Sequence, residues 1–201
     1  MKGKWHIYVI IKQKGYRMPA VSKEVYIPHY TYSDYLAWEG EWELIDGIAY
    51  AMAPAPVKKH QVLIGLLFKE LLKDIGECSE CEVLIDTDWK VSSDTVLKPD
   101  VSVVCHDSNP KYISKTPDII FEVISPSTAK KDEGLKYEIY EEEGVKYYVL
   151  VYPEDLIARV FHLEQGKYKK VAECDTESFD FKETECPAGV DFTAVFGKYR
   201  K

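Results

Sequence analysis

Residues 117–128 read PDIIFEVISPST, and this stretch decides the fold. Its apolar centre is typical of a buried strand, and the Ser-Pro-Ser-Thr that follows is typical of a break before a helix. One carboxylate, Glu122, lies inside the apolar run. A second apolar run, DVSVVC at residues 100–105, begins with Asp100 directly after a proline. An acid in an apolar strand is costly unless a cation or a donor compensates it, so the two runs predict a shared polar site.

The segments on either side of these strands predict the rest of the fold. Asp46-Gly47 between apolar runs predicts a hairpin over residues 42–52, and apolar residues at steps of three and four predict a helix over 57–75. Another helix is expected after Thr128, ending at Gly144. Further strands, hairpins and short helices are predicted at residues 5–12, 32–38, 82–91, 146–152, 157–171 and 192–196. This order predicts an α/β (α+β) fold with a mixed β-sheet flanked by helices and extra β-hairpins.

Length and composition are those of a single globular domain. The chain has 201 residues, 46% of them hydrophobic, which is enough for one core. We expect one domain over residues 26–201, preceded by an N-terminal extension, 1–25, with no assigned role. The apolar runs are too short to span a membrane, and the early run at 5–11 is a poor signal peptide. We therefore expect a cytoplasmic protein with no membrane partner.

The charges are unevenly distributed along the chain. A formal net charge of -8 argues against a broad nucleic-acid-binding surface. Residues 1–30 nevertheless hold six basic residues against Glu24 alone. Two interpretations of this segment stay open: a solvated extension, which we favour, and an arm that grips phosphates.

The five cysteines are an odd number, which favours a reduced compartment over a disulfide framework. Cys78 and Cys81 form a C-x-x-C pair, the spacing of many zinc and redox sites. A zinc site needs a second pair, and Cys105, Cys174 and Cys186 do not supply one at the usual spacing. We therefore expect ordinary loop and strand-edge cysteines.

The two acids and the helix that follows them can form a catalytic group. Strand parity puts Asp100 and Glu122 on matching faces if their strands are neighbours in the right register. Asp132, Lys136 and Tyr140 are four residues apart and lie along one stripe of the following helix. Two carboxylates that hold Mg²⁺, with a lysine beside the attacking water, can hydrolyse a phosphodiester. A purely structural interpretation also stays open. In it Asp100 is a turn acid, Glu122 forms an ion pair with Lys136, and Asp132 caps a helix.

Several motifs follow one another in order along the chain. They are Glu43-Leu44-Ile45-Asp46-Gly47, Met52-Ala53-Pro54, His60-Gln61, Pro99-Asp100-Val101-Ser102-Val103, Pro117-Asp118 through Thr128, then Asp132, Lys136, Tyr140 and Gly144-Val145-Lys146-Tyr147-Tyr148. Together they resemble the Uma-two family of restriction endonucleases, in the PD-(D/E)XK nuclease superfamily. The resemblance covers residues 26–165, and the run at 121–128 is its most specific part.

The resemblance implies a restriction-endonuclease-like core, with Asp100 and Glu122 as ligands of Mg²⁺ and Mn²⁺ as a substitute. The superfamily's usual lysine stands two places after the second acid, and Ile124 occupies that place here. The lysine that matches the family, Lys136, lies on the following helix instead. The implied catalytic lysine is therefore displaced along the chain from its usual place.

Three further residues are matched by the resemblance. Tyr140 completes a Lys-x-x-x-Tyr pattern, and Glu43 and His60 match family positions at the edge of the site. From the residues alone, His60 on the inward face of a helix is as well explained as a satisfied polar group. Glu43 on a hairpin is ordinary as an exposed acid, and only the resemblance gives it a role.

Three functions follow as hypotheses. The one we favour is a Mg²⁺-dependent endonuclease that hydrolyses phosphodiester bonds, with DNA as its expected partner. The alternatives are a non-catalytic nucleic-acid-binding module and a homo-oligomeric interaction protein that keeps the nuclease fold. A homodimer is also compatible with the first hypothesis, because two active sites could cut both strands of a duplex.

Overall fold

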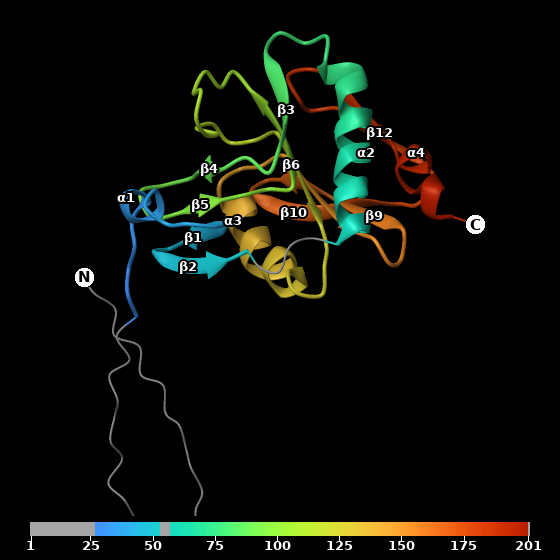
Figure 1. Ribbon diagram of the computed structural model, residues 1–201. Helices are drawn as coiled ribbons and strands as arrows, with labels where there is room; N and C mark the ends of the chain where they lie inside the picture. The colour runs from blue at the N-terminus through green and yellow to red at the C-terminus, as the bar shows by residue number, and fades with distance from the viewer. Residues whose placement is uncertain (1–26, 53–56, 201) are drawn as a thin grey trace, which may run out of the picture.

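The computed structural model describes residues 27–52 and 57–200, and its centre is a six-stranded sheet (Figure 1). The strand order is β10-β9-β8-β7-β6-β3. Only β7 and β8 are parallel, and every other neighbouring pair in this sheet is antiparallel. The strands are β3 (Cys81–Ile85), β6 (Val101–Cys105), β7 (Ile119–Val123), β8 (Tyr147–Tyr152), β9 (Ile157–Glu164) and β10 (Lys167–Cys174).

One face of this sheet is covered by helices and a small hairpin. The long helix α2 (Lys58–Ile75) lies beside β12 and α4, as Figure 1 shows. Its leucines at 63, 67 and 71 are fully buried against the sheet, as the three- and four-residue spacing predicts. The other elements on this face are β11 (Ser178–Phe181), β12 (Ala188–Asp191) and α4 (Phe192–Phe196), followed by the 3₁₀ turn η2 (Gly197–Tyr199).

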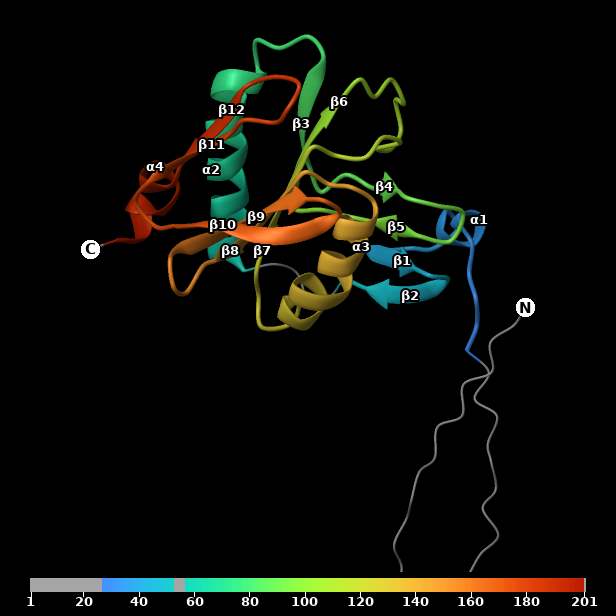
Figure 2. The same ribbon diagram turned by 180° about the vertical axis from the view of Figure 1, so that it is seen from behind.

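The opposite face packs against a π-helical segment, a short helix and a second sheet (Figure 2). The ring of Tyr140 lies 5.0 Å from that of Tyr148 and 5.8 Å from that of Trp89, so the helix, the large sheet and the small sheet meet in one aromatic core. The elements are η1 (Lys131–Lys136), α3 (Tyr137–Glu142) and a sheet of order β2-β1-β5-β4. Its strands are β1 (Trp42–Ile45), β2 (Ile48–Ala51), β4 (Trp89–Lys90) and β5 (Val96–Leu97), and α1 (Tyr32–Tyr35) precedes them.

Because both faces of the large sheet are covered, its central strands are apolar on both sides. All five residues of β7 are buried, with Phe121 facing α2 and Ile120 facing α3. This explains the continuous apolar run in the sequence. It also places the carboxyl group of Glu122 in the interior of the protein, where this residue is 3% exposed.

The predicted fold class is confirmed, and so are the best-marked elements. The 42–52 hairpin turns at Asp46 and Gly47, whose φ angles of 49° and 74° suit the tight turn that this dipeptide predicts. The helix predicted at 57–75 and the hairpin predicted at 157–171 are present as α2 and β9–β10. None of the helices in the described residues is long and apolar enough to cross a bilayer.

Three strands were not predicted: β5, β11 and β12. The two-residue β5 is too short to show a pattern, and β11 and β12 are separated by the charged segment 182–186. The strand predicted at residues 5–12 lies outside the described residues.

The expectation of unconnected cysteines is wrong. Two disulfide pairs, Cys78–Cys186 and Cys81–Cys105, bring four of the five cysteines together at one edge of the sheet. Cys174 is free and buried. Spacing along the chain could not reveal this, because the pairs join residues 108 and 24 positions apart.

Candidate functional site

The strand register places the two predicted metal ligands opposite each other. β6 and β7 pair with Val101 opposite Phe121, so one further step along the register sets Asp100 opposite Glu122. The backbone N–H of Val123 donates to Asp100 Oδ2 at 2.6 Å, which ties the start of β6 to the end of β7. Both carboxylates therefore lie at the same end of two adjacent strands, as the parity of the sequence predicts.

Lys136 is the centre of the ionic network at this site. Its Nζ lies 2.7 Å from Glu122 Oε1 and 2.8 Å from Glu43 Oε1, and 3.8 Å from Asp132 Oδ1. The side chain is 2% exposed although it carries an ammonium group. A buried charge of this kind is stable only when it is paired and hydrogen-bonded, and the three carboxylates meet that need. The lysine beside the second acid is therefore Lys136, whereas the position two places after that acid is occupied by Ile124.

Tyr140 and the π-helical segment set the position of these groups. The hydroxyl of Tyr140 donates to Glu122 Oε1 at 2.8 Å, the same oxygen that Lys136 contacts. The wide turn of η1 brings residues four apart more nearly into line than an α-helix does, so Asp132 and Lys136 project to the same side. The hydroxyl of Tyr148 donates to the carbonyl of Asp132 at 2.9 Å and anchors η1 to the large sheet.

Glu43 lies at the centre of the ionic network and not at its edge, and the alternative interpretation of Glu43 as an ordinary exposed acid is wrong. It is fully buried, although it lies on the β1–β2 hairpin. Besides Lys136, it contacts Lys131 Nζ and accepts a 3.0 Å hydrogen bond from the backbone N–H of Lys98. Lys98 and Lys131 were not predicted. Their role follows from long-range contacts across 55 and 88 residues, which leave no local signal in the sequence.

His60 reaches the site from the first turn of α2. Its Nε2 lies 3.3 Å from Asp100 Oδ2, and its Nδ1 has no hydrogen-bond partner among the described residues. Burial lowers the pKa of His60, but the hydrogen bond to Asp100 and its negative charge outweigh this and raise that pKa above its usual value. His60 thus contacts one acid of the pair, while Tyr140 contacts the other.

The formal charges of the site do not cancel. Four buried carboxylates face the buried ammonium group of Lys136 and the partly exposed one of Lys131, which leaves two formal negative charges in excess before His60 is counted; the carboxylates are those of Glu43, Asp100, Glu122 and Asp132. Burial raises the pKa of Glu122 well above its usual value, Lys136 opposes this only in part, and the neighbouring acids add to the rise. Burial also raises the pKa of Asp132, and the charge of Asp100 adds to the rise, although Lys136 opposes it. The cluster is therefore short of positive charge.

For Lys136 and Glu43, by contrast, the neighbouring charges favour the ionised form. Burial would lower the pKa of Lys136, but Glu122, Glu43 and Asp132 hold it well above its usual value. Burial would raise the pKa of Glu43, but Lys136 and Lys131 hold it below its usual value. Lys136 and Glu43 are therefore a charged pair at neutral pH, and Lys136 is not a proton acceptor in this arrangement.

The donor set fits a hard divalent cation. The second oxygens of the acids, Asp100 Oδ1 and Glu122 Oε2, carry no hydrogen bond from the described residues. Mg²⁺ takes oxygen ligands and keeps several waters, so one or two carboxylates are enough to hold it. These acids do not form a closed cage: among the described residues, only Cys78, Cys81 and Cys186 offer three ligand atoms within 4.8 Å of one another.

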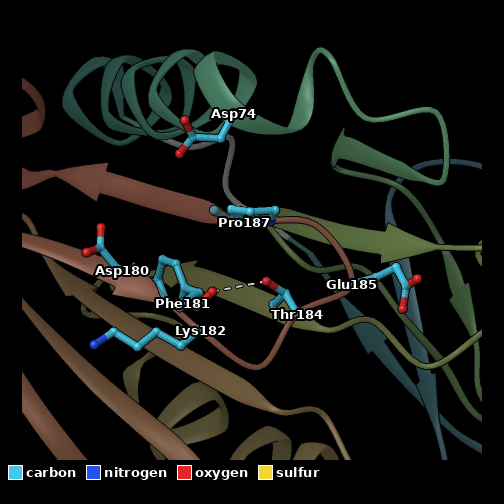
Figure 3. Close-up of a pocket in the computed structure, with 8 residues that line it drawn as sticks. Asp74, Asp180, Phe181, Lys182, Thr184, Glu185 and Pro187 are labelled. Atoms are coloured by element: carbon cyan, nitrogen blue, oxygen red, sulfur yellow. Dashed lines mark hydrogen bonds between the residues drawn. The ribbon is translucent and has the colours of Figure 1, made fainter.

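An open surface pocket lies elsewhere, between Asp74 at the end of α2 and the β11–β12 hairpin (Figure 3). It is lined by Asp180, Phe181 and Pro187 among others and contains no residue of the ionic network. The candidate site is instead the buried cluster where the large sheet, the small sheet, η1 and α2 meet. All six predicted site residues lie in it: Glu43, His60, Asp100, Glu122, Lys136 and Tyr140.

Comparisons with known proteins identify the family and the fold of this chain. The model of the family Uma2, described as "Putative restriction endonuclease", matches residues 32–184. The chain belongs to the Uma2 family. A relative in Synechocystis, "Uncharacterized protein slr1290", is 30% identical over 159 residues, which cover 72% of this chain and 80% of the relative.

A crystal structure has the same fold as this Uma2 chain. It is described as "a putative nuclease belonging to DUF820" from Anabaena variabilis, and it superposes with a TM-score of 0.65 at 15% sequence identity. The match covers 83% of this chain and 97% of that structure. At this identity the likeness concerns the fold, and it establishes a nuclease-like fold for the Uma2 chain.

Proposed function

We propose that this Uma2 protein is a Mg²⁺-dependent endonuclease that hydrolyses phosphodiester bonds in DNA. The observation that carries the proposal is the pairing of Asp100 and Glu122 at the ends of two adjacent strands, with the ammonium group of Lys136 2.7 Å from Glu122. The excess of two formal negative charges, counted with Lys131 and Lys136, supports a divalent cation as the missing partner.

Asp100 and Glu122 would hold Mg²⁺, with Mn²⁺ as a substitute. When bound, the ion neutralises charge on the scissile phosphate and lowers the pKa of a water ligand. Because the carboxylates around it keep Lys136 protonated, this residue acts by stabilising negative charge that develops at the phosphate, not by removing the proton of the water.

The remaining residues position these three. Tyr140 fixes the orientation of the Glu122 carboxylate through its 2.8 Å hydrogen bond, and the 3.3 Å contact of His60 does the same for Asp100. Glu43 holds the ammonium group of Lys136 from the other side, at 2.8 Å. A reacting geometry held by packed side chains costs little reorganisation during the reaction.

The test is cleavage of supercoiled and linear DNA by the purified full chain with Mg²⁺, Mn²⁺ or EDTA, with RNA assayed in parallel. We expect metal-dependent cutting of DNA. Asp100→Asn and Glu122→Gln should each lower the rate by about 10²-fold or more while circular dichroism stays unchanged. Asp118→Asn is the matched control, because Asp118 is an acid near β7 that pairs with Lys146 outside the cluster. Equal rates for all three variants would refute the proposal.

One observation favours a second candidate, a nucleic-acid-binding protein without turnover. Lys136, Tyr140 and the Val123 N–H already satisfy one oxygen of each acid within the chain, as in a purely structural ion-pair network. This candidate predicts binding of DNA in EDTA and no cleavage under any metal condition. The same assay, read by mobility shift, therefore separates the two.

Two such sites in a homodimer could cut both strands of a duplex, so we include a homodimer in the proposed function. Sedimentation of the chain with and without DNA tests this part. A monomer that nicks only one strand would contradict the proposed homodimer but not the proposed endonuclease activity.

A further inference from the structure

We propose that the four clustered cysteines, Cys78, Cys81, Cys105 and Cys186, form a structural zinc site in the reduced protein. This site is separate from the carboxylate cluster. Asp100 precedes β6 and Cys105 ends it, and at about 3.3 Å per residue the two lie roughly 16 Å apart along the strand. The inference therefore does not depend on the proposed function.

The first step is the convergence of the sulfur atoms. Cys78, Cys81 and Cys186 lie with their Sγ atoms within 4.8 Å of one another, and Cys105 is bonded to Cys81. The group thus includes sulfurs from both disulfide pairs. Two independent disulfides need no such convergence, whereas four thiolates around one zinc ion do. With Zn–S bonds of about 2.3 Å, a tetrahedral site holds its sulfurs about 3.8 Å apart.

The second step is the origin of the four ligands. Cys78 follows α2, Cys81 begins β3, Cys105 ends β6 directly opposite Cys81, and Cys186 precedes β12. The C-x-x-C pair is the usual first half of a zinc site, and the fold supplies the second half from two distant segments. A single ion would then join α2, the edge of the large sheet and the β11–β12 hairpin.

The third step is that residues next to the cysteines already hold these segments together. His106, next to Cys105, places its Nδ1 3.0 Å from Glu80 and its Nε2 3.6 Å from Glu185, and these two acids precede Cys81 and Cys186. Its backbone N–H also donates to the carbonyl of Glu80 at 2.7 Å. The backbone around the cluster is therefore fixed before any ion binds.

The loop that carries Cys186 is fixed in the same way. The hydroxyl of Thr184 donates to the carbonyl of Cys186 at 2.6 Å and lies 3.0 Å from that of Phe181, the contact drawn in Figure 3. In the same view Pro187 lies below the end of α2, and Glu185 points away from Asp180. Cys81 is buried and the other three cysteines are partly buried, so the site can exclude bulk water and still admit an ion.

The proposal is tested by the metal and thiol content of the full chain. The protein is purified anaerobically with a reductant, which is then removed. We expect one zinc per chain by mass spectrometry and five titratable thiols after denaturation in a chelator. X-ray absorption at the zinc edge should show four sulfur ligands at about 2.3 Å. One titratable thiol without zinc, five thiols without zinc uptake from added Zn²⁺, or a zinc ion bound to nitrogen and oxygen would each overturn it.

Variants locate the ion. Cys81→Ser and Cys105→Ser should each weaken zinc retention against a competing chelator at least tenfold, whereas Cys174→Ser should keep one zinc, because Cys174 is free and outside the cluster. If a ligand variant does not fold, the X-ray absorption of the wild-type chain still decides the question. Full zinc retention by folded Cys81→Ser and Cys105→Ser would contradict the assignment.

Discussion

Lys136 stabilises the protein as well as the site, because three carboxylates surround a side chain that is 2% exposed. Removing one partner of a buried pair leaves the other charge uncompensated, and this costs more than the pair contributes. Lys136→Met keeps most of the side-chain volume and deletes the ammonium group with its hydrogen bonds. The change in the free energy of unfolding therefore measures what the ammonium group contributes to stability.

We expect Lys136→Met to lower the free energy of unfolding by about 3–5 kcal/mol in urea titrations without metal. Adding Glu122→Gln should restore part of the loss, because the second variant removes one of the charges left unpaired. The two changes will thus be non-additive. Lys169→Met, at an exposed lysine, is the control and should change stability by less than about 0.5 kcal/mol. An additive double variant would show that Lys136 and Glu122 are not energetically coupled.

The prediction from sequence was strongest for residues whose position follows from local pattern. Asp100 and Glu122 could be placed on matching faces because strand parity is strict and their strands are adjacent in the sheet. Glu43 could not, because its burial depends on Lys136, Lys131 and the backbone of Lys98, all distant along the chain. A hairpin acid with no visible partner looks exposed until the tertiary contacts are known.

At the scale of elements, the segment between Thr128 and Gly144 shows the limit of periodicity. The sequence predicts one helix, and the structure has η1 followed by α3. Both give Asp132, Lys136 and Tyr140 a common side, so the pattern could not distinguish a π-helical turn from an α-helical one. π-helical turns occur often at functional sites, which agrees with the place of η1 beside the two acids.

The side chain of Asp107 holds the loop between β6 and β7 through several hydrogen bonds. Asp107 accepts hydrogen bonds from the backbone N–H of Asn109 at 2.9 Å, of Ser114 at 2.5 Å and of Lys115 at 3.1 Å. Partial burial raises the pKa of Asp107, but these hydrogen bonds outweigh it and hold that pKa below its usual value. The loop joins the two strands that carry the acids of the site.

We expect Asp107→Ala to lower the free energy of unfolding by about 1–2 kcal/mol at neutral pH, since several hydrogen bonds in a partly exposed loop are lost. Because the pKa of Asp107 is lower in the folded than in the unfolded state, its contribution is full above the unfolded pKa, about 3.9, and disappears as the pH falls through the folded pKa. The difference between wild type and variant should therefore shrink below about pH 4.

Urea titrations at several pH values measure this, with Asp155→Ala, at an exposed acid in another loop, as the control. If the difference in the free energy of unfolding between wild type and Asp107→Ala stayed constant as the pH falls below about 4, the ionised form of Asp107 would not be what stabilises the loop.

At the scale of the whole molecule, two clusters join parts of the chain that are distant in sequence. The ionic network connects the small sheet, η1, α2 and the large sheet, and the cysteine cluster connects the other end of β6 to α2 and the β11–β12 hairpin. Local sequence patterns predict elements and their exposed faces. They do not predict which distant residues come together, as the Cys78–Cys186 and Cys81–Cys105 pairs illustrate.

The excess negative charge of the ionic network predicts that metal binding stabilises the fold, whether or not the protein cuts DNA. A ligand that binds only the folded state adds RT ln(1 + [L]/Kd), about 2.7 kcal/mol at one hundred times Kd. For a chain of this size, we expect saturating Mg²⁺ to raise the melting temperature by about 5–10 °C. Differential scanning calorimetry over a Mg²⁺ series at constant ionic strength measures this.

The increase should be lost in Asp100→Asn and Glu122→Gln and kept in Asp118→Asn, whose acid lies outside the network. Burial and the neighbouring acids raise the pKa of Glu122, and Lys136 keeps Glu43 and Asp132 as partners when this charge is removed, so the melting temperature of Glu122→Gln without metal should equal or exceed that of the wild type. The response to Mg²⁺ and the intrinsic stability are therefore expected to change in opposite directions. If both variants kept the full Mg²⁺ response, the ion would be binding elsewhere, and the paired acids would be a structural network only.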